Sequence, residues 1–405
     1  MDLILNSSIT HSLLLVLPVA VAYLLRKAGC PGWPVVGGAV AGLLLGPTIL
    51  GRVAPELHER RFVGGVEARA TLTSIQRRHA ADLLALRAAG ADDPLTIQTL
   101  ERHQAELETP RAEWRAAQWS FQRPFRTYGS VIIVAALLGA GMLGRPRAAA
   151  EPQGRWPLAA SIGVWSACVP GAFAAAAMIA WWTHPPAAAS AAAAAVAVGP
   201  WVLSHDDWTE ADDAEFAGGR TLEHAGRVAS LVALAAAAFA LARSLGVAGL
   251  LWGAPLLALI AGWWIPPVEG DARRWARGAL SYGVVPILTA CVALRVDLIT
   301  HFTLAPVVLL VILSGDGRWL GAFAGATLPG GRGAVPGLRL VIGSMACAPT
   351  QLAVTLVGAH TGLLPEPVTL ALLLGAIMLA VTTPARRRVG QWLRDGIDEP
   401  PATPP

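Results

Sequence analysis

"APVVLLVILSGDGRWLGAFAG" (residues 305–325) places an acid and a base inside one of the most apolar parts of the chain. Asp316 and Arg318 stand two residues apart, and each is next to a glycine. On an α-helix, residues i and i+2 point about 200° apart, so the two side chains cannot pair along one helix face. Each charge therefore needs its own partner, or the backbone here departs from a regular helix.

Two interpretations of this stretch remain open from the sequence. If residues 302–326 form one membrane span, they cover about 38 Å, and the charges lie near mid-membrane, where each costs roughly 2.5–3.5 kcal/mol on insertion scales. If residues 298–315 span alone, they cover about 27 Å, and the charges lie among the headgroups with Trp319 as an interface anchor. The first interpretation predicts a functional pair, and the second predicts a helix end.

Long uncharged runs indicate the fold class. Only 14% of the 405 residues are charged and 54% are hydrophobic, whereas a soluble domain carries about 25% charged residues. Since a bilayer core of about 30 Å takes roughly 20 helical residues, the runs predict an all-α polytopic membrane protein with about 10–13 transmembrane helices. The runs are residues 3–25, 32–51, 156–184, 185–204, 228–242, 245–267, 278–294, 298–315, 340–364 and 367–384.

Four segments follow from this pattern. Residues 1–51 hold the first two transmembrane helices, 52–127 a polar insertion, and 128–385 the transmembrane core. Residues 386–405 form a tail that begins with three arginines, which the positive-inside tendency places in the cytoplasm. The N-terminus lacks a basic region before its apolar run, so we expect a first membrane helix rather than a cleaved signal peptide.

The polar insertion predicts an antiparallel helical hairpin. Leu72, Ile75, Leu83 and Leu86 recur at helical spacing, and the turn "AAGADDP" precedes a second helical pattern. His79 falls on the same apolar face, where we expect it to pack rather than to bind a ligand. The hairpin either lies on the membrane surface or serves as an arm that forms a homodimer or binds another partner.

The sequence indicates neither an enzyme nor a nucleic-acid-binding protein. No clustered nucleophile, phosphate loop or zinc-ligand spacing occurs in the polar segments, so we expect no cofactor and no metal site. The four cysteines stand far apart in or beside apolar runs, as small buried hydrophobic residues do. The arginines lie mainly in loops, which membrane topology explains without nucleic acid.

Five stretches occur in an order that is specific to one group of membrane proteins. They are "RKAGCPGWPVVGGAVAGLLLGPTILG" (26–51), "SLGVAGLLWGAPLLALIAGWW" (244–264), "VVPILTACVALRVDL" (284–298), "GDGRWLGAFAGA" (315–326) and "MLAVTTPARRR" (378–388). Together they resemble the monovalent cation:proton antiporters, the sodium/hydrogen exchanger family, over most of the chain outside residues 52–126.

The resemblance implies a fold and a function. The fold is an inverted repeat with two crossed, broken helices near the midplane, and transport alternates access to a site between them. A monovalent cation and a proton compete there for the same carboxylate. The resemblance thus implies a protein of the bacterial inner (plasma) membrane, with the lipid bilayer, a cation and a proton as its partners.

Several of the family's acidic residues are missing from this chain. The family's "TDP" at the first broken helix falls at Val198–Pro200, so Gly199 stands in place of the aspartate before Pro200. Asp297 and Arg318 keep charge at matching positions. The resemblance therefore favours the buried interpretation of the opening stretch, with Arg318 in the role of the family's basic residue.

Three further residues complete the candidate ion pathway. Asp316 is the acid beside Arg318, and Gln351 falls where the family carries a late "GE" motif. Gln351 can hydrogen-bond across helices, which is also what a residue that only joins helices does. Asp207 is the surviving carboxylate nearest the expected first-half site, although a hydrated acidic loop also explains its stretch, "HDDWTEADD".

Two functional hypotheses follow. The first is a secondary transporter that exchanges a monovalent cation, or another small solute, for protons. The second is a degenerate, non-transporting relative that serves as a membrane scaffold or sensor, which the lost acids and the long hairpin motivate. A membrane enzyme has less support, since no His/Asp/Ser constellation recurs at membrane depth.

Overall fold

The computed structural model describes residues 2–88, 93–143, 156–180, 185–198, 270–327 and 348–398. Within these ranges every regular element is a helix and no strand occurs, which confirms the all-α prediction for them. Among the described residues, three helical stretches are long and apolar enough to cross a membrane, namely Trp33–Val53, Arg274–Ala293 and Glu366–Ala385. Shorter apolar helices cover Tyr128–Leu138, Cys168–Ala180 and Pro186–Val196. The full number of spans and the inverted repeat stay predictions.

The chain divides into two compact units. The described residues of Met1–Leu13 and Leu45–Tyr128 form the first unit, and those of Leu14–Leu44 and Gly129–Pro405 form the second. One helix, α6 (Asp93–Leu143), belongs to both. The second arm of the predicted hairpin and the predicted span that starts at residue 128 are therefore a single helix.

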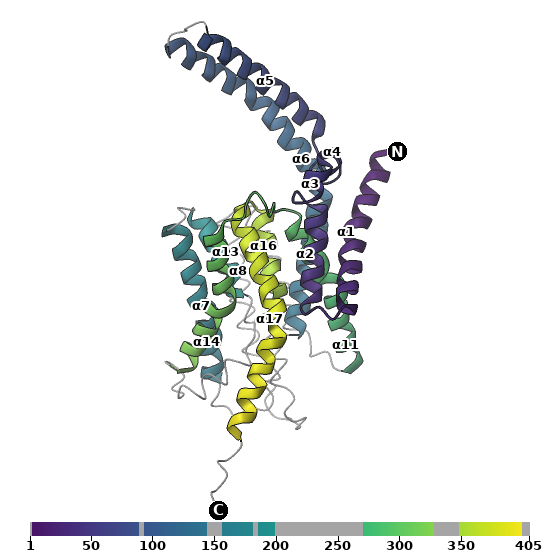
Figure 1. Ribbon diagram of the computed structural model, residues 1–405, viewed down its shortest axis with the longest axis vertical. Helices are drawn as coiled ribbons and strands as arrows, with labels where there is room; N and C mark the ends of the chain where they lie inside the picture. The colour runs from purple at the N-terminus through teal and green to yellow at the C-terminus, as the bar shows by residue number, and fades with distance from the viewer. Residues whose placement is uncertain are drawn as a thin grey trace, which may run out of the picture. The chain divides into compact units, whose positions relative to one another are not determined.

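The first unit is built around the hairpin. Its elements between α2 and α6 are α3 (Leu50–Val53), α4 (Pro55–His58), the π-helix η1 (Glu59–Val63) and α5 (Val66–Ala88). Gly64, with a φ of 77°, reverses the chain between η1 and α5, and an added Cβ there would lie 2.4 Å from Cγ of Phe121. Glycine fits this turn because it has no Cβ. The helices α5 and α6 run side by side as the predicted antiparallel pair (Figure 1).

The second unit gathers the apolar helices. Its elements are most of α1 (Asp2–Lys27) and α2 (Trp33–Leu45), the end of α6, then α7 (Trp156–Ala180), α8 (Pro186–Val198), α11 (Gly270–Ala279), η2 (Leu280–Val284), α12 (Val285–Ala293), α13 (Leu304–Ile312), η3 (Leu313–Gly317), α14 (Arg318–Thr327), α16 (Ala348–His360) and α17 (Glu366–Asp398).

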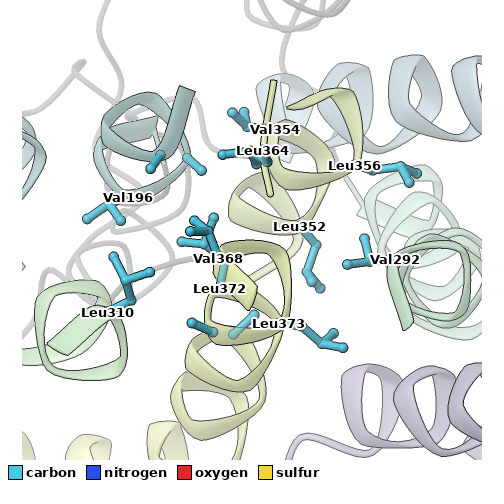
Figure 2. Close-up of a cluster of buried hydrophobic side chains, with 14 of the residues drawn as sticks. Val196, Val292, Leu310, Leu352, Val354, Leu356, Leu364, Val368, Leu372 and Leu373 are labelled. Carbon is cyan, nitrogen blue, oxygen red and sulfur yellow. The ribbon is translucent and has the colours of Figure 1, made fainter. Parts of the chain in front are cut away.

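Helix α16 lies at the centre of this unit. Every residue from Thr350 to Gly358 is buried, and α16 packs against α8, α12 and α17. Figure 2 shows α16 and α17 between Val292 of α12 on one side and Val196 of α8 with Leu310 of α13 on the other. A helix that is buried all round belongs in the interior of a large apolar core, so its polar residues are enclosed.

Small residues bring α2 against α12. An added Cβ on Gly38 would lie 2.2 Å from the carbonyl oxygen of Pro286, and one on Gly42 would lie 2.6 Å from that of Ala290. Helices in apolar surroundings associate through such close backbone contacts. The glycines within residues 26–51, the first of the five stretches that resemble the antiporters, thus form a helix-packing surface.

Helix α17 is longer than the predicted last span. It continues past residue 385, where the predicted core ends, through Arg386–Arg388 to Asp398. Arginine is a good helix former, so the three arginines extend the helix. The first part of the predicted tail is therefore helical.

Candidate functional site

The opening stretch forms continuous helical backbone with a π-helical turn at its middle. The helix α13 leads into η3 without a break, and α14 follows directly. Asp316 lies on η3, and Arg318 is the first residue of α14. The interpretation that ends the helix at Gly315 therefore does not match the backbone. A π-turn holds one residue more than an α-turn, and such turns often occur at functional sites.

Ser314 ties this π-turn to the buried helices α16 and α17. The Gln351 amide nitrogen donates to Ser314 Oγ at 3.1 Å and to the carbonyl oxygen of Leu372 at 3.0 Å. Both Ser314 and Gln351 are fully buried. One amide thus joins three elements, which confirms that Gln351 hydrogen-bonds across helices.

Two glycines make room for this arrangement. An added Cβ on Gly375 of α17 would lie 3.1 Å from Ser314 Oγ and 3.4 Å from the Gln351 amide nitrogen. On η3 itself, a Cβ on Gly317 would lie 3.2 Å from Cβ of Pro170 in α7. The π-turn is therefore packed closely by α17 and by α7, and larger residues at either glycine would push against it.

The surroundings of Gln351 are polar but neutral. Thr355 donates its hydroxyl to the Gln351 backbone carbonyl at 2.7 Å, and Thr350 is fully buried beside it. Such groups offer hydroxyl and carbonyl oxygens, which suit a desolvated cation, and none of them titrates near neutral pH. On η3 itself the carboxylate is that of Asp316, whose side chain lies outside the described part of the structure, as does that of Arg318.

Asp297 lies in a different setting, the loop between α12 and α13. Its carboxylate accepts the backbone N–H of Ile299 at 3.0 Å and the Thr300 hydroxyl at 2.5 Å. An aspartate that binds the backbone two residues on forms an Asx turn. Asp297 therefore shapes its own loop, whereas Ser314 and Gln351 lie within helices.

The remaining candidates cannot be placed. Asp207, Gly199 and Pro200 lie outside the described residues. Among the residues predicted to form the ion pathway, Gln351 contacts the π-turn that carries Asp316, through its hydrogen bond to Ser314.

Ser314 and Gly375 are two residues of this site that the sequence did not predict. Ser314 is the one hydroxyl in "VVLLVILSGDG", directly before the charged pair, and that position could have indicated it. Gly375 carries no comparable signal, because its role depends on which helix α17 meets.

The hairpin holds a second cluster of buried polar groups. His79 and His103 are each 5% exposed, and their rings stack with centroids 3.8 Å apart and planes 2° from parallel. His79 Nε2 lies 2.8 Å from Glu106 Oε2, and His103 Nε2 lies 3.6 Å from Asp82 Oδ2. The expected packing role of His79 is confirmed, and its stacking partner His103 was not anticipated.

Hydrogen bonds and nearby charges link the groups of this cluster. The hydrogen bond with His79 lowers the pKa of the Glu106 carboxyl below its ordinary value, and the charges on Arg102 and Arg78 act in the same direction. Within the described part of the chain, no group of three or more His, Cys, Asp or Glu residues could hold a metal ion.

Comparison with protein-family models and with curated proteins finds no match to this chain.

Proposed function

We propose that the protein is a polytopic membrane protein of the bacterial inner membrane and a secondary transporter that exchanges a monovalent cation for protons. One observation supports this most directly. The π-turn that carries Asp316 is hydrogen-bonded through Ser314 to the Gln351 amide inside an apolar helical core. A buried polar group in a membrane-spanning bundle is costly and commonly marks an ion or substrate pathway.

In this proposal each group has a defined task. The Asp316 carboxylate takes a proton or a cation, but not both at once, which couples the two fluxes. The Gln351 amide holds the turn in place through Ser314, and the hydroxyl groups nearby replace part of the cation's hydration shell. Arg318 balances the acid when neither ligand is bound. No cofactor and no covalent step is involved, so the protein is not an enzyme in this proposal.

A second candidate function is a non-transporting membrane scaffold or sensor. The observation that favours it is that the buried polar side chains described in the second unit are all neutral. Under this alternative the Gln351 bonds only join helices, and the hairpin of α5 and α6 serves as an arm for a partner or a second copy.

Flux measurements in proteoliposomes distinguish the two functions. Purified protein under an imposed pH gradient is challenged with Na⁺, K⁺ and Li⁺ in turn. The transporter predicts proton flux that needs one of these cations and is lost in Asp316→Asn and Arg318→Ala. Glu101→Gln is the matched control, since Glu101 is an exposed carboxylate on α6, and this variant should keep the flux.

Two outcomes would contradict transport through this turn. Flux that persists in Asp316→Asn would remove that carboxylate from the pathway. Absence of flux with all three cations, in protein whose thermal unfolding is cooperative, would favour the scaffold.

A further inference from the structure

The end of α1 carries two neighbouring cations that contact aromatic rings. Arg26 and Lys27 end α1, and both are exposed. Within the described residues, both side chains contact aromatic rings, and no carboxylate forms an ion pair with either of them. A pair of unneutralised cations at the end of an apolar helix needs an anion or water to complete it.

Aromatic rings fix the position of both cations. Arg26 Cζ lies 4.8 Å from the Tyr282 ring centroid and 5.9 Å from that of Trp33, and these two rings are 4.7 Å apart. Lys27 Nζ lies 5.0 Å from the ring of Tyr23. Cations over aromatic faces within about 6 Å are attracted by the ring quadrupole. We call these five residues, Tyr23, Arg26, Lys27, Trp33 and Tyr282, the Arg26 cluster.

The aromatic contacts leave the hydrogen-bond donors of Arg26 available. A guanidinium carries five N–H donors, and an aromatic ring offers them no carboxylate or carbonyl oxygen as acceptor. The fork of N–H groups matches the oxygens of a phosphate, and Lys27 adds a second cation in the next position of the chain. The cluster is therefore shaped for a singly charged phosphate diester.

The backbone of the turn is held rigidly. Gly32 has a φ of 67°, and an added Cβ there would lie 2.7 Å from the backbone of Ala380 in α17. A positive φ and so close an approach both require glycine. The cluster is thus preorganised, which lowers the entropic cost of binding a ligand.

The cluster joins two of the membrane-length helical stretches. Trp33 is the first residue of the stretch Trp33–Val53, and Tyr282 lies within Arg274–Ala293. The exposed side chains of Arg274, Arg277 and Trp275 follow one another on α11, directly before Tyr282, and Trp275 is 76% exposed. Tryptophan, tyrosine and arginine together are typical of the headgroup level of a bilayer.

We propose that the Arg26 cluster is a binding site for the phosphate of an anionic phospholipid headgroup. The inference rests on the proposed function only in requiring insertion into a bilayer. The lipid phosphate accepts hydrogen bonds from the edge of Arg26 and pairs with Lys27, while its acyl chains lie along α1 and α2.

Native mass spectrometry of the full-length protein in a nonionic detergent tests this. The protein is titrated with dioleoylphosphatidylglycerol and, separately, with dioleoylphosphatidylcholine, and the apparent Kd of the first bound lipid is measured. We expect selectivity for phosphatidylglycerol. Since a basic residue near an anionic lipid contributes about 1 kcal/mol, Arg26→Gln and Lys27→Gln should each weaken that lipid about fivefold.

Three further variants keep the test sharp. Arg26→Lys keeps the charge but loses the planar fork, so its affinity should fall between those of the wild type and Arg26→Gln. Tyr282→Leu keeps every charge, and it should also weaken binding because Arg26 loses its orientation. Arg77→Gln, at an exposed arginine of the hairpin in the first unit, is the matched control and should bind as the wild type does.

The proposal is overturned by equal affinity for the two lipids, by unchanged affinity in Arg26→Gln, or by an equal loss in Arg77→Gln. Displacement of phosphatidylglycerol by excess inorganic phosphate would assign the cluster to a soluble anion instead. Lipid selectivity without ion flux would contradict the proposed function alone, and flux without lipid selectivity would contradict only this inference.

Discussion

The two compact units bury different kinds of polar side chain. Among the described residues, the first unit buries His58, His79 and His103 together with Thr48. The polar side chains that the structure describes as buried in the second unit carry hydroxyl and amide groups, those of Thr289, Ser314, Thr350, Gln351, Thr355 and Thr369. Imidazole takes up a proton close to neutral pH, whereas hydroxyl and amide groups do not titrate there.

This difference separates two ways of joining helices. In the second unit, neutral groups and bare backbone allow close contact in apolar surroundings, where a charge would be costly. In the first unit, stacked rings and ion pairs join α5 to α6, and the carboxylates of these pairs are exposed. Mild acid should therefore act on the described contacts of the first unit and leave those of the second unchanged.

The largest effect is expected at the glycine contact of the second unit. In Gly38→Ala the new Cβ would meet the Pro286 carbonyl at 2.2 Å, and backbone cannot rotate away as a side chain can. We expect a loss of about 3 kcal/mol or more in the free energy of unfolding, equal at neutral and mildly acidic pH. Thermal unfolding in detergent, followed by circular dichroism, measures it.

The matched control is Gly278→Ala on α11, where an added Cβ meets nothing within 4 Å. Alanine favours a helix over glycine by about 1 kcal/mol, so this variant should be slightly stabilised. If Gly38→Ala unfolded at the wild-type temperature, the close contact of α2 and α12 would be contradicted.

Variants of Gln351 test whether the stability of the second unit can be made to depend on pH. Gln351→Met keeps the volume and removes both hydrogen bonds to Ser314 and Leu372, so we expect a loss of about 1–3 kcal/mol that does not depend on pH. Gln351→Glu should be worse at neutral pH, because a carboxylate cannot donate to the Leu372 carbonyl. Protonation restores a donor, so this variant alone should make the second unit more stable as pH falls. Unfolding measured across pH in both variants tests this, and a flat profile for Gln351→Glu would contradict it.

His58 should make the first unit sensitive to mild acid. Burial lowers the pKa of His58 below its usual 6.5, and the nearby Glu59 charge only partly opposes this. Just below pH 6.5, His58 is protonated in the unfolded chain but stays neutral in the folded chain. The free energy of unfolding is therefore highest above pH 6.5 and falls as pH drops below that value. The slope cannot exceed about 1.4 kcal/mol per pH unit for one proton.

Replacement of His58 by phenylalanine sharpens this prediction. The ring of His58 stacks on Phe62 with centroids 5.9 Å apart, and Phe at position 58 keeps an aromatic contact without a titrating group. Hydrogen exchange of residues 55–88 at neutral and mildly acidic pH should show less acid-induced opening in His58→Phe. An unchanged pH response would contradict the assignment of this acid sensitivity to His58.

The smallest effect is expected for Glu106→Gln, because Glu106 is exposed. The pKa of Glu106 is held below 4.5 chiefly by the hydrogen bond with His79, so its contribution is present above pH 4.5 and is lost as pH falls through the lowered value. The variant should lose a little stability at neutral pH and lose this acid-dependent step. Hydrogen exchange of α5 measures it, with Glu101→Gln as the control, and an equal response in both would contradict a specific role for the His79 contact.

The sequence predicted those features that depend on local pattern. Uncharged runs and helical spacing indicated an all-α chain with a hairpin, because hydropathy and periodicity belong to each segment alone. The sequence shows Gly38 and Gly42 one helical turn apart, but their partners in α12 could not be read from it. The pairing of His79 with His103 depends on the register between two helices. The π-turn adds one residue without changing composition, so neither hydropathy nor charge reveals it.

The extra residue in η3 rotates the faces of α14 relative to those of α13 within one continuous helix. It turns every position after it by about 100° relative to the positions before it. Helix α13 packs against α17, and α14 packs against α7. The packing partner of the continuous helix therefore changes at this turn. A deletion of one residue here would put α13 and α14 back in step, and both halves would then compete for the same neighbour.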